Sequence, residues 1–523
     1  MTTPDTLEAG TYALEEIHAP YGYIVDSTPI QFKVSMNTAY QMAEDGQTLL
    51  ITVTKRDESV KGKIKVSKIG EQLVDVETDD HGNIQFVYDE LPVDGAEFIV
   101  EAGEDIYSAD NQKTLIYSEG EQVAKLRTKN GYAETDLLPL GKYRVYEITA
   151  GETFVLDAEI KEVELTYKDE NTSLVFDKVE AVNQRQRIDL NVKKTDEESG
   201  TGLSGAVFGL YASENIQSIS SQEVLVNAGT LIETVTTDEN GKAKFSADLP
   251  IGFSFEIREL KAPIGYSSTD EVYSFDTDYQ GQEIPVLELN VIFKNQITQI
   301  EVSKKDITNE EEIAGAFLIV YPKGDEGAIF DSWISGQDGV NEDGTIRPHV
   351  IRGLEAGKTY VLKEISAPYG YAIAQEVEFT VQDTGEIQKV EMKDDMVFGQ
   401  LKWNKYGEIF NQVITGQNEF GITQSPVWNE SNLLGAEITI YAAEEIRIGN
   451  HVFYEKDEEI QTLESDWEDV LSQKLPVGKY YYKESKTPHG YITDTDKHYF
   501  EVKDNQINEI QIVESTLEIE RTA

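Results

Sequence analysis

Three polar residue types recur on segments whose apolar and polar residues alternate as they do in β-strands. Because side chains alternate faces along a strand, residues two apart share a face. Tyr143 and Val145 therefore share a face with Glu147, and Val66 shares one with Lys68. The residues that obey this rule are Glu16, Glu147, Glu259, Glu364 and Glu484; Lys68, Lys194, Lys304 and Lys405; and Asn183, Asn295 and Asp394. The spacing predicts that an amine, a carboxyl and a carbonyl group meet in one apolar core.

Burying these three groups together is costly unless they satisfy one another. One interpretation is a buried, hydrogen-bonded ion pair that is retained for structural specificity. The other is a covalent amide between the lysine and the asparagine or aspartate. Desolvation lowers a lysine pKa, which frees the neutral amine to attack, and a glutamate protonated by the same surroundings can polarise the carbonyl and shuttle protons. Ammonia would leave from asparagine and water from aspartate, once per site, so this chemistry is maturation and not turnover.

The glutamates belong to a phrase that occurs five times, starting at Leu7, Leu138, Leu249, Leu354 and Leu475. Four copies continue into a Pro-x-Gly-Tyr turn, whereas the second has Ile148–Gly151 in its place. A Gly-Ala strand precedes four of the copies, and a lysine-bearing strand precedes each of those. Self-similarity of this kind is typical of arrays built from one small module.

The segments between these phrases are short, alternating and rich in Val, Ile, Tyr, Phe and Thr, with turn dipeptides such as Asn130–Gly131. Such segments predict an all-β chain with a β-sandwich in each unit. Linkers of about ten residues should join adjacent units. Residues 463–473 could form one short helix.

The repeats divide the chain into five modules, which we call the first to the fifth. They span residues 1–60, 61–186, 187–298, 299–397 and 398–523. The first is predicted to be the C-terminal part of a truncated module, because nothing before Leu7 can supply its opening strands.

Composition narrows the function classes. The 523 residues carry a formal net charge of −52, which repels nucleic acid and anionic lipid, so neither is expected as a partner. The chain has no cysteine and its six histidines show no ligand spacing, so we expect no metal site and no cofactor. No apolar run approaches membrane-spanning length, and the segment from Met1 lacks the features of a secretory signal.

Together, the lysine strand, the Gly-Ala strand and the Tyr-x-Leu-x-Glu box with its Pro-x-Gly-Tyr turn resemble the Cna B-type (SpaA-like, prealbumin-like) repeats of Gram-positive surface adhesins and pilins. The resemblance covers essentially the whole chain. It implies Ig-like, prealbumin/transthyretin-like sandwiches in an elongated rod, with intramolecular isopeptide bonds between first and last strands and the box glutamate as catalyst. Carried over by position, it gives three sets: Lys68, Glu147 and Asn183; Lys194, Glu259 and Asn295; and Lys304, Glu364 and Asp394.

Two modules depart from this pattern. In the fifth, Ile519 stands where the acceptor belongs, so Lys405 and Glu484 have no carbonyl partner and we predict no bond. In the first, Asp57 has the acceptor spacing, although Lys55 competes for the same slot. The lysine strand of the first module is outside this chain, so Glu16 and Asp57 are predicted to be orphaned.

The resemblance implies an extracellular, cell-wall-anchored surface protein whose export and anchoring signals lie outside this chain. We expect a stalk that presents a binding region away from the cell. The alternative is that the modules themselves bind a host or matrix ligand, such as collagen or a glycan; a pilin subunit or a secreted glycan-active enzyme is a weaker alternative. No phosphate loop, nucleophile motif or metal set favours an enzyme.

The second and fifth modules carry extra residues between the lysine and Gly-Ala strands. These segments span 27 residues from Lys68 to Gly95 and 30 from Lys405 to Gly435, against 11 in the third and fourth modules. The extra residues have the pattern of an added hairpin. It could brace the neighbouring module or present a ligand surface, and bracing is the favoured interpretation.

Overall fold

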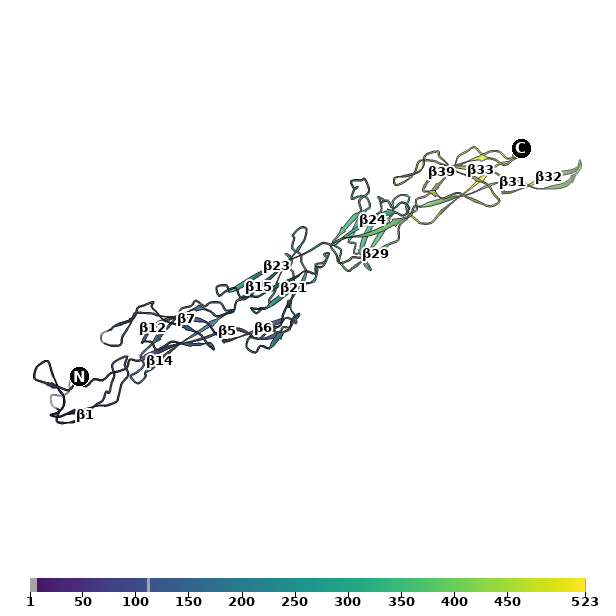
Figure 1. Ribbon diagram of the computed structural model, residues 1–523. Helices are drawn as coiled ribbons and strands as arrows, with labels where there is room; N and C mark the ends of the chain where they lie inside the picture. The colour runs from purple at the N-terminus through teal and green to yellow at the C-terminus, as the bar shows by residue number, and fades with distance from the viewer. Residues whose placement is uncertain (1–6, 111–112, 523) are drawn as a thin grey trace. The chain divides into compact units, whose positions relative to one another are not determined.

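The computed structural model describes residues 7–110 and 113–522 (Figure 1). Within these residues every regular element is a β-strand, and sheets recur along the chain, which confirms the prediction of tandem β-sandwich modules. No helix long and apolar enough to cross a membrane occurs in this described part. Residues 1–6, which bear on the secretory-signal prediction and open the first module, lie outside it, as does residue 523.

The prediction of a short helix at residues 463–473 is wrong. This segment holds the end of β36 (Glu459–Glu464), a loop, and the two-residue strand β37 (Val470–Leu471). In the loop the Asp466 carboxylate accepts a hydrogen bond from the backbone N–H of Trp467 at 2.7 Å. Further on, β37 pairs antiparallel with β31 (Phe398–Asn418), so the backbone of Val470 and Leu471 belongs to a sheet and not to a helix.

The chain divides into two compact units. One comprises Met1–Thr195, Thr201–Lys261 and Asp270–Phe293, and the other comprises Asp196–Gly200, Ala262–Thr269 and Lys294–Ala523. The first unit holds the first two modules and most of the third. The second unit holds the fourth and fifth modules.

The first module contains two small hairpins, and the second and third modules are complete sandwiches. The first module has β1 (Gly10–Leu14), β2 (Ile30–Val34), β3 (Gln41–Met42) and β4 (Leu49–Leu50). The second has β5 (Lys61–Thr78), β6 (Ile84–Pro92), β7 (Glu97–Ala102), β8 (Ile106–Tyr107), β9 (Leu115–Tyr117), β10 (Gln122–Arg127), β11 (Tyr132–Glu134), β12 (Gly141–Thr149), β13 (Lys161–Leu165) and β14 (Leu174–Asn183). The third has β15 (Arg187–Asp196), β16 (Val207–Ala212), β17 (Ile216–Gln217), β18 (Val224–Val226), β19 (Leu231–Thr236), β20 (Lys242–Lys244), β21 (Ser254–Lys261), β22 (Val272–Asp276) and β23 (Val286–Asn295).

The second unit repeats this plan. The fourth module has β24 (Gln299–Asp306), β25 (Phe317–Pro322), β26 (Asp331–Ile334), β27 (His349–Arg352), β28 (Thr359–Ser366), β29 (Val377–Thr380) and β30 (Ile387–Asp394). The fifth has β31 (Phe398–Asn418), β32 (Gly421–Asn432), β33 (Glu437–Ala442), β34 (Ile446–Ile448), β35 (His451–Tyr454), β36, β37, β38 (Leu475–Pro476), β39 (Gly478–Lys486), β40 (His498–Val502) and β41 (Gln511–Glu518).

Each complete module pairs its first strand with its last. In the second module β14 runs parallel to β5, and in the fourth and fifth modules β30 and β41 run parallel to β24 and β31. The facing sheet places the Gly-Ala strand beside the glutamate strand, as with β7 and β12. Apolar side chains from both sheets share one core, for example Ile64 of β5 and Val145 of β12. The lysine, glutamate and closing strands therefore bring their inward residues to the same interior.

The junctions between modules are shorter than the predicted ten residues. Only residues 184–186 separate β14 from β15, and only residues 395–397 separate β30 from β31. The sequence-based estimate counted from acceptor to lysine, and most of those positions belong to the next module's first strand.

The added residues of the second and fifth modules do form hairpins. The first strand continues past its lysine and turns back antiparallel, as β5–β6 and as β31–β32. In the first unit, Leu73 and Phe86 of the β5–β6 hairpin join the hydrophobic core of the third module. This hairpin braces its neighbour.

Candidate cross-linking sites

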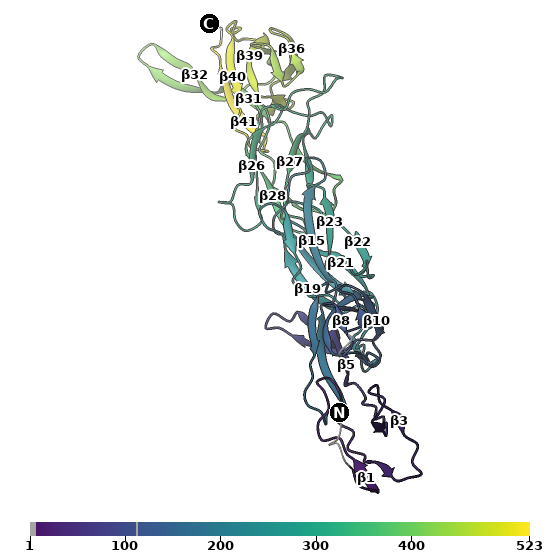
Figure 2. The ribbon, with the colours of Figure 1, turned by 90° about the vertical axis from the view of Figure 1, so that its left-hand side faces the viewer.

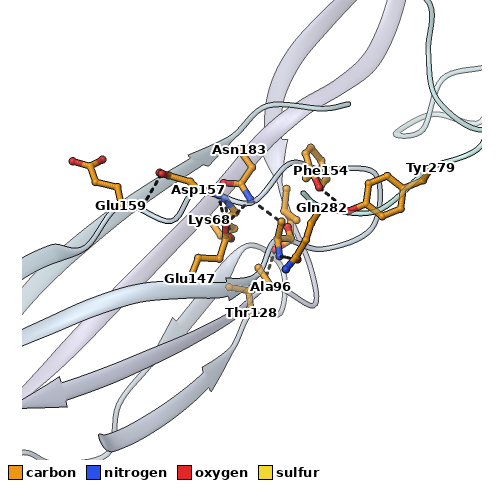
Figure 3. A network of polar contacts seen from close by, with 12 residues as sticks. Lys68, Ala96, Thr128, Glu147, Phe154, Asp157, Glu159, Asn183, Tyr279 and Gln282 are labelled. Carbon is orange, nitrogen blue, oxygen red and sulfur yellow. Dashed lines mark hydrogen bonds and ion pairs between the residues drawn. The ribbon is translucent and has the colours of Figure 1, made fainter. Parts of the chain in front are cut away.

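In the second module the three predicted residues meet. The Lys68 amine lies 3.2 Å from Glu147 Oε1, and the Asn183 amide nitrogen donates to Glu147 Oε2 at 2.7 Å. Figure 3 shows the three side chains converging from β5, β12 and β14. All three are buried. One carboxylate thus holds both the amine and the amide between the sheets.

The register of the parallel pair explains this geometry. Lys68 lies opposite Ala181, and Asn183 lies opposite Gly70, two positions further along. Residues two apart share a face, so the lysine and asparagine are diagonal neighbours on the core side. At Gly70, which lies opposite Asn183, an added Cβ would lie 2.4 Å from the Phe154 ring. This ring therefore packs directly on the strand beside the acceptor residue.

The fourth module brings its three residues together in the same way. Lys304 lies opposite Met392, and Asp394 lies opposite Asp306. The Lys304 amine is 3.0 Å from Glu364 Oε1 and makes an ion pair and hydrogen bond with the Asp394 carboxylate. Both carboxyl side chains are fully buried, and the lysine nearly so.

The third and fifth modules bury the same lysine–glutamate pair. The amine-to-carboxylate distance is 2.9 Å for Lys194 and Glu259, and 2.7 Å for Lys405 and Glu484. Asn295 is the buried last residue of β23, which neighbours β15 in its sheet.

In the fifth module the residue at the acceptor position is apolar. Lys405 lies opposite Leu517, and the Ile519 backbone N–H donates to the carbonyl of Tyr406 just beyond the end of β41. Ile519 packs at the edge of the module's core. This module therefore holds the amine and the carboxyl beside a side chain that has no carbonyl group.

In the first module Asp57 lies at Glu16. Burial raises the pKa of Asp57, and the nearby Glu16, which shares a side-chain hydrogen bond with it, raises it further. The competing Lys55 instead donates to the carbonyls of Asp26 and Thr28 and pairs with the Asp26 carboxylate at 3.6 Å. The structure therefore puts Asp57, and not Lys55, beside the glutamate.

A contact that sequence patterns did not reveal orients the box glutamates. Oε2 of each accepts a hydrogen bond from the backbone N–H ten residues further on, at 2.7–3.2 Å, in four modules: Asp26 to Glu16, Asp157 to Glu147, Ala374 to Glu364 and Asp494 to Glu484. Because the second oxygen is fixed in this way, Oε1 points at the lysine in the second, fourth and fifth modules. In the sequence, the only feature that could have predicted this hydrogen bond was the constant spacing between each glutamate and the turn that follows it.

The turn itself closes the acceptor end of each module. Its aromatic residue forms a β-bridge with the residue two positions after the acceptor slot, as in Tyr371 with Met396 and Tyr491 with Arg521. The second module, which lacks the Pro-x-Gly-Tyr residues, makes the same bridge with Phe154. There Thr153 takes the glycine's left-handed backbone conformation, with φ of 74°, so the turn persists at some cost in strain.

Burial changes the protonation of these groups in the direction that amide formation needs. It lowers the pKa of Lys68, Lys194 and Lys405, although each paired glutamate opposes this effect. Burial also raises the pKa of Asp394 to about 7, against the opposing charge of Lys304. A neutral amine and a protonated acid are the reactive forms for such a bond.

Comparison with known proteins gives the family of these modules. A family model described as the SpaA prealbumin-like fold domain matches residues 1–48, 87–180, 188–288, 298–396 and 421–516. The trypsin-resistant surface T6 protein of Streptococcus pyogenes is 37% identical over 87 residues, which is 17% of this chain and 13% of that protein. Among solved structures, the TIE protein of Bacillus anthracis is 21% identical, with 87% of this chain and 75% of that chain covered and a TM-score of 0.40. The major pilin subunit BcpA of Bacillus cereus is 14% identical, with 64% and 99% covered and a TM-score of 0.30.

Proposed function

This chain belongs to the SpaA prealbumin-like fold domain family, and we propose that it is a structural stalk of a Gram-positive surface protein, stapled by three intramolecular isopeptide bonds. The observation that carries the proposal is the Glu147 carboxylate, which contacts both the Lys68 amine and the Asn183 amide inside the second module. The surface T6 protein of Streptococcus pyogenes, which shares one stretch of sequence with this chain, supports the surface location.

In the proposed reaction the neutral Lys68 amine attacks the side-chain carbonyl carbon of Asn183. The new C–N bond forms, the C–NH₂ bond breaks, and Glu147 carries a proton from the amine to the leaving group, which departs as ammonia. In the fourth module the same attack by Lys304 on protonated Asp394 breaks a C–O bond and releases water. Each site reacts once, so the chemistry matures the chain and turns over no substrate.

Buried polar atoms without a hydrogen bond gather at these sites, including that of the fifth module, for which no bond is predicted. Among the described residues, thirteen buried side-chain nitrogen or oxygen atoms make no hydrogen bond, and seven of them belong to the lysine, glutamate and acceptor residues of the second, fourth and fifth modules. They include the Lys68 amine and the Asn183 oxygen. The Lys68 amine keeps its ion pair with Glu147, but burying a charge with few hydrogen bonds is costly. An isopeptide bond would convert the buried lysine amine into a neutral amide, which costs less to keep out of water.

The bonds would suit a stalk because they join the first strand of a module to its last. Tension applied through the chain would then pass across the bond, and the residues between would stay unloaded. Each bond closes a loop of roughly 90–115 residues, for which the chain-entropy model gives about 4–5 kcal/mol of stabilisation. No reductant can open such a bond.

The test is the intact mass of the purified chain. We expect a deficit equal to two ammonias and one water, and each of Glu147→Ala, Glu259→Ala and Glu364→Ala should restore one loss. Glu484→Ala is the matched control and should leave the deficit unchanged. A mass equal to that of the unmodified sequence would leave buried ion pairs as the only role of these residues.

A further inference from the structure

The hairpins of the second and fifth modules are equivalent position by position. Leu73 and Phe410 each lie five residues after the module's lysine, and both strands carry a bulge directly after these residues. Across the hairpin, Leu73 faces Tyr88 and Phe410 faces Trp428. A shared bulge at the same offset fixes the same local twist and the same choice of faces. The two hairpins thus present one face built to one plan.

An arginine completes this face in both modules. Arg185 follows the acceptor Asn183 by two positions and stacks on Tyr88, with its guanidinium carbon 3.8 Å from the ring centroid. Arg521 follows Ile519 by two positions and stacks on Trp428 at 3.9 Å. Arg185 and Arg521 are therefore equivalent in position and in their stacking on the hairpin's aromatic ring.

In the first unit the third module covers this face. Tyr88 donates its hydroxyl to the carbonyl of Asp248 at 2.7 Å. Arg185 donates to the carbonyl of Leu249 at 3.0 Å and pairs with the Asp248 carboxylate. Leu73 is only 1% exposed, because it packs in the core of residues 187–298. The third module therefore contributes apolar contacts and the carbonyls at the start of its Leu-Pro-x-Gly phrase.

In the fifth module the same face meets solvent. Phe410 is 54% exposed, and Val413, the counterpart of Val76, is 46% exposed. The Arg521 side chain is 42% exposed, compared with 4% for Arg185. Figures 1 and 2 show the β31–β32 hairpin extending away from the sheets of its own module. A face this apolar is the usual mark of an interface.

We propose that the β31–β32 face, with Arg521, is the docking surface for a further prealbumin-like module joined in the same chain directly after Arg521. The third module, joined after Arg185, is the template for this partner. Its Leu-Pro-x-Gly phrase supplies carbonyls to Arg521 and Trp428, and its core side covers Phe410 and Val413. The same Leu-Pro-x-Gly phrase also begins at Leu138 and Leu475 in this chain, so it is a recurrent part of these modules.

The test extends the chain with its own third module. A copy of residues 186–298 is joined directly after Arg521, which reproduces the natural Arg185–Gln186 junction, and amide hydrogen exchange is compared with that of the unextended chain. Exchange in residues 408–430 should slow by about tenfold or more and approach that of residues 71–90 in the same molecule. Protection of the copied strand of residues 207–212 shows in the same measurement that the added module is folded.

Two variants of the extended chain keep the result specific. Phe410→Asp and Arg521→Ala should each return the hairpin's exchange to its unextended rate. Both side chains are about half exposed, and the unextended chain with Arg521→Ala is the control for loss of the Arg521–Glu408 ion pair at 2.9 Å. Unchanged hairpin exchange beside a folded added module would overturn the proposal. Hairpin protection in the unextended chain that rises with protein concentration would also overturn it, because the face would then serve self-association.

Discussion

The fourth and fifth modules bury the same pair of charges and differ at one position beside it. Lys304 and Glu364 approach to 3.0 Å, and Lys405 and Glu484 to 2.7 Å. The closing strand of the fourth module ends at Asp394, which pairs with its lysine, whereas the fifth module has Ile519 at the corresponding position. The ion pair therefore forms in the fold whether or not an acceptor is present.

This difference separates two roles that the sequence alone left combined. In the fifth module the lysine and glutamate serve as a structural pair, as buried ion pairs do elsewhere. In the fourth module the same pair faces a carbonyl carbon. The acceptor residue alone would then decide whether a module is cross-linked, and the comparison can be tested from both sides.

The largest effect should come from giving the fifth module an acceptor. Ile519→Asn places an amide beside Lys405 and Glu484, so the chain should lose one further ammonia in its intact mass. The new bond should stabilise the module by about 4–5 kcal/mol, as the loop-closure model gives for a loop of this length. Adding Glu484→Gln to the variant should prevent the loss; a variant that keeps its full mass would show that the fifth module's geometry is not competent.

Breaking the unbonded pair should have the next largest effect. Lys405→Met leaves the Glu484 carboxylate buried beside an apolar side chain, so the unfolding free energy of the fifth module should fall by about 3–5 kcal/mol. Hydrogen exchange in β33 and β39 would report it. The double variant Lys405→Met/Glu484→Leu removes both charges and should recover most of the loss. If the single variant is as stable as the parent chain, the pair has no structural role.

The fourth module should show a pH dependence when its bond is blocked. In Glu364→Gln the Asp394 carboxyl stays buried, and burial is the main cause that raises its pKa from 3.8 to about 7 in the parent chain; the variant loses only the smaller contribution of Glu364. Between these values the folded state holds a proton that the unfolded state has released, so stability is greatest below about pH 4 and falls as the pH rises to about 7. From pH 5 to pH 8 the loss should be at most about 2–3 kcal/mol, because the variant lacks the part of the pKa shift that Glu364 causes.

This dependence would be measured by hydrogen exchange in β24 and β28 at the two pH values. Adding Asp394→Asn removes the titrating group and should flatten the profile. The fifth module has no acceptor carboxyl and serves as the internal reference. Equal slopes with and without Asp394 would assign the pH effect to another group.

The smallest effect concerns the tyrosines that close the two modules. The Tyr371 hydroxyl donates to the buried Asp306 carboxylate at 2.8 Å, so Tyr371→Phe should cost about 1.5–3 kcal/mol. The Tyr491 hydroxyl donates to the exposed carbonyl of Glu408, so Tyr491→Phe should cost less, about 0.5 kcal/mol. Thermal unfolding of both variants checks the order, and equal losses would contradict it.

Strand parity made the candidate sites predictable. Every box glutamate and every lysine lies on its strand's apolar row, and a period of two needs no knowledge of which strands pair. Parity cannot supply the parallel register of first and last strands, because that register depends on contacts between residues about 90 or more positions apart. The diagonal placement of Lys68 and Asn183 therefore required the structure.

Other features could not be predicted from the sequence, because different residue types form the same local structure in different modules. Thr153 and Phe154 build the turn that the second module was thought to lack, since Thr153 adopts a backbone conformation normally left to glycine. The equivalence of the two hairpins was equally hidden, because Leu73 and Tyr88 in one become Phe410 and Trp428 in the other. At these positions the residue types differ between modules, although the backbone turn and the strand pairing are the same.

The parallel pairing of first and last strands also bears on how such proteins change over evolution. Because β24 and β30 run in the same direction, the chain enters this module at one end and leaves it at the opposite end. When one whole module is duplicated or deleted, the chain therefore still enters each neighbouring module at the same end. Copy number can then vary by recombination between repeats wherever the core of a module is its own; the third module, whose core includes Leu73 and Phe86 of the second, would lose part of its core with its neighbour.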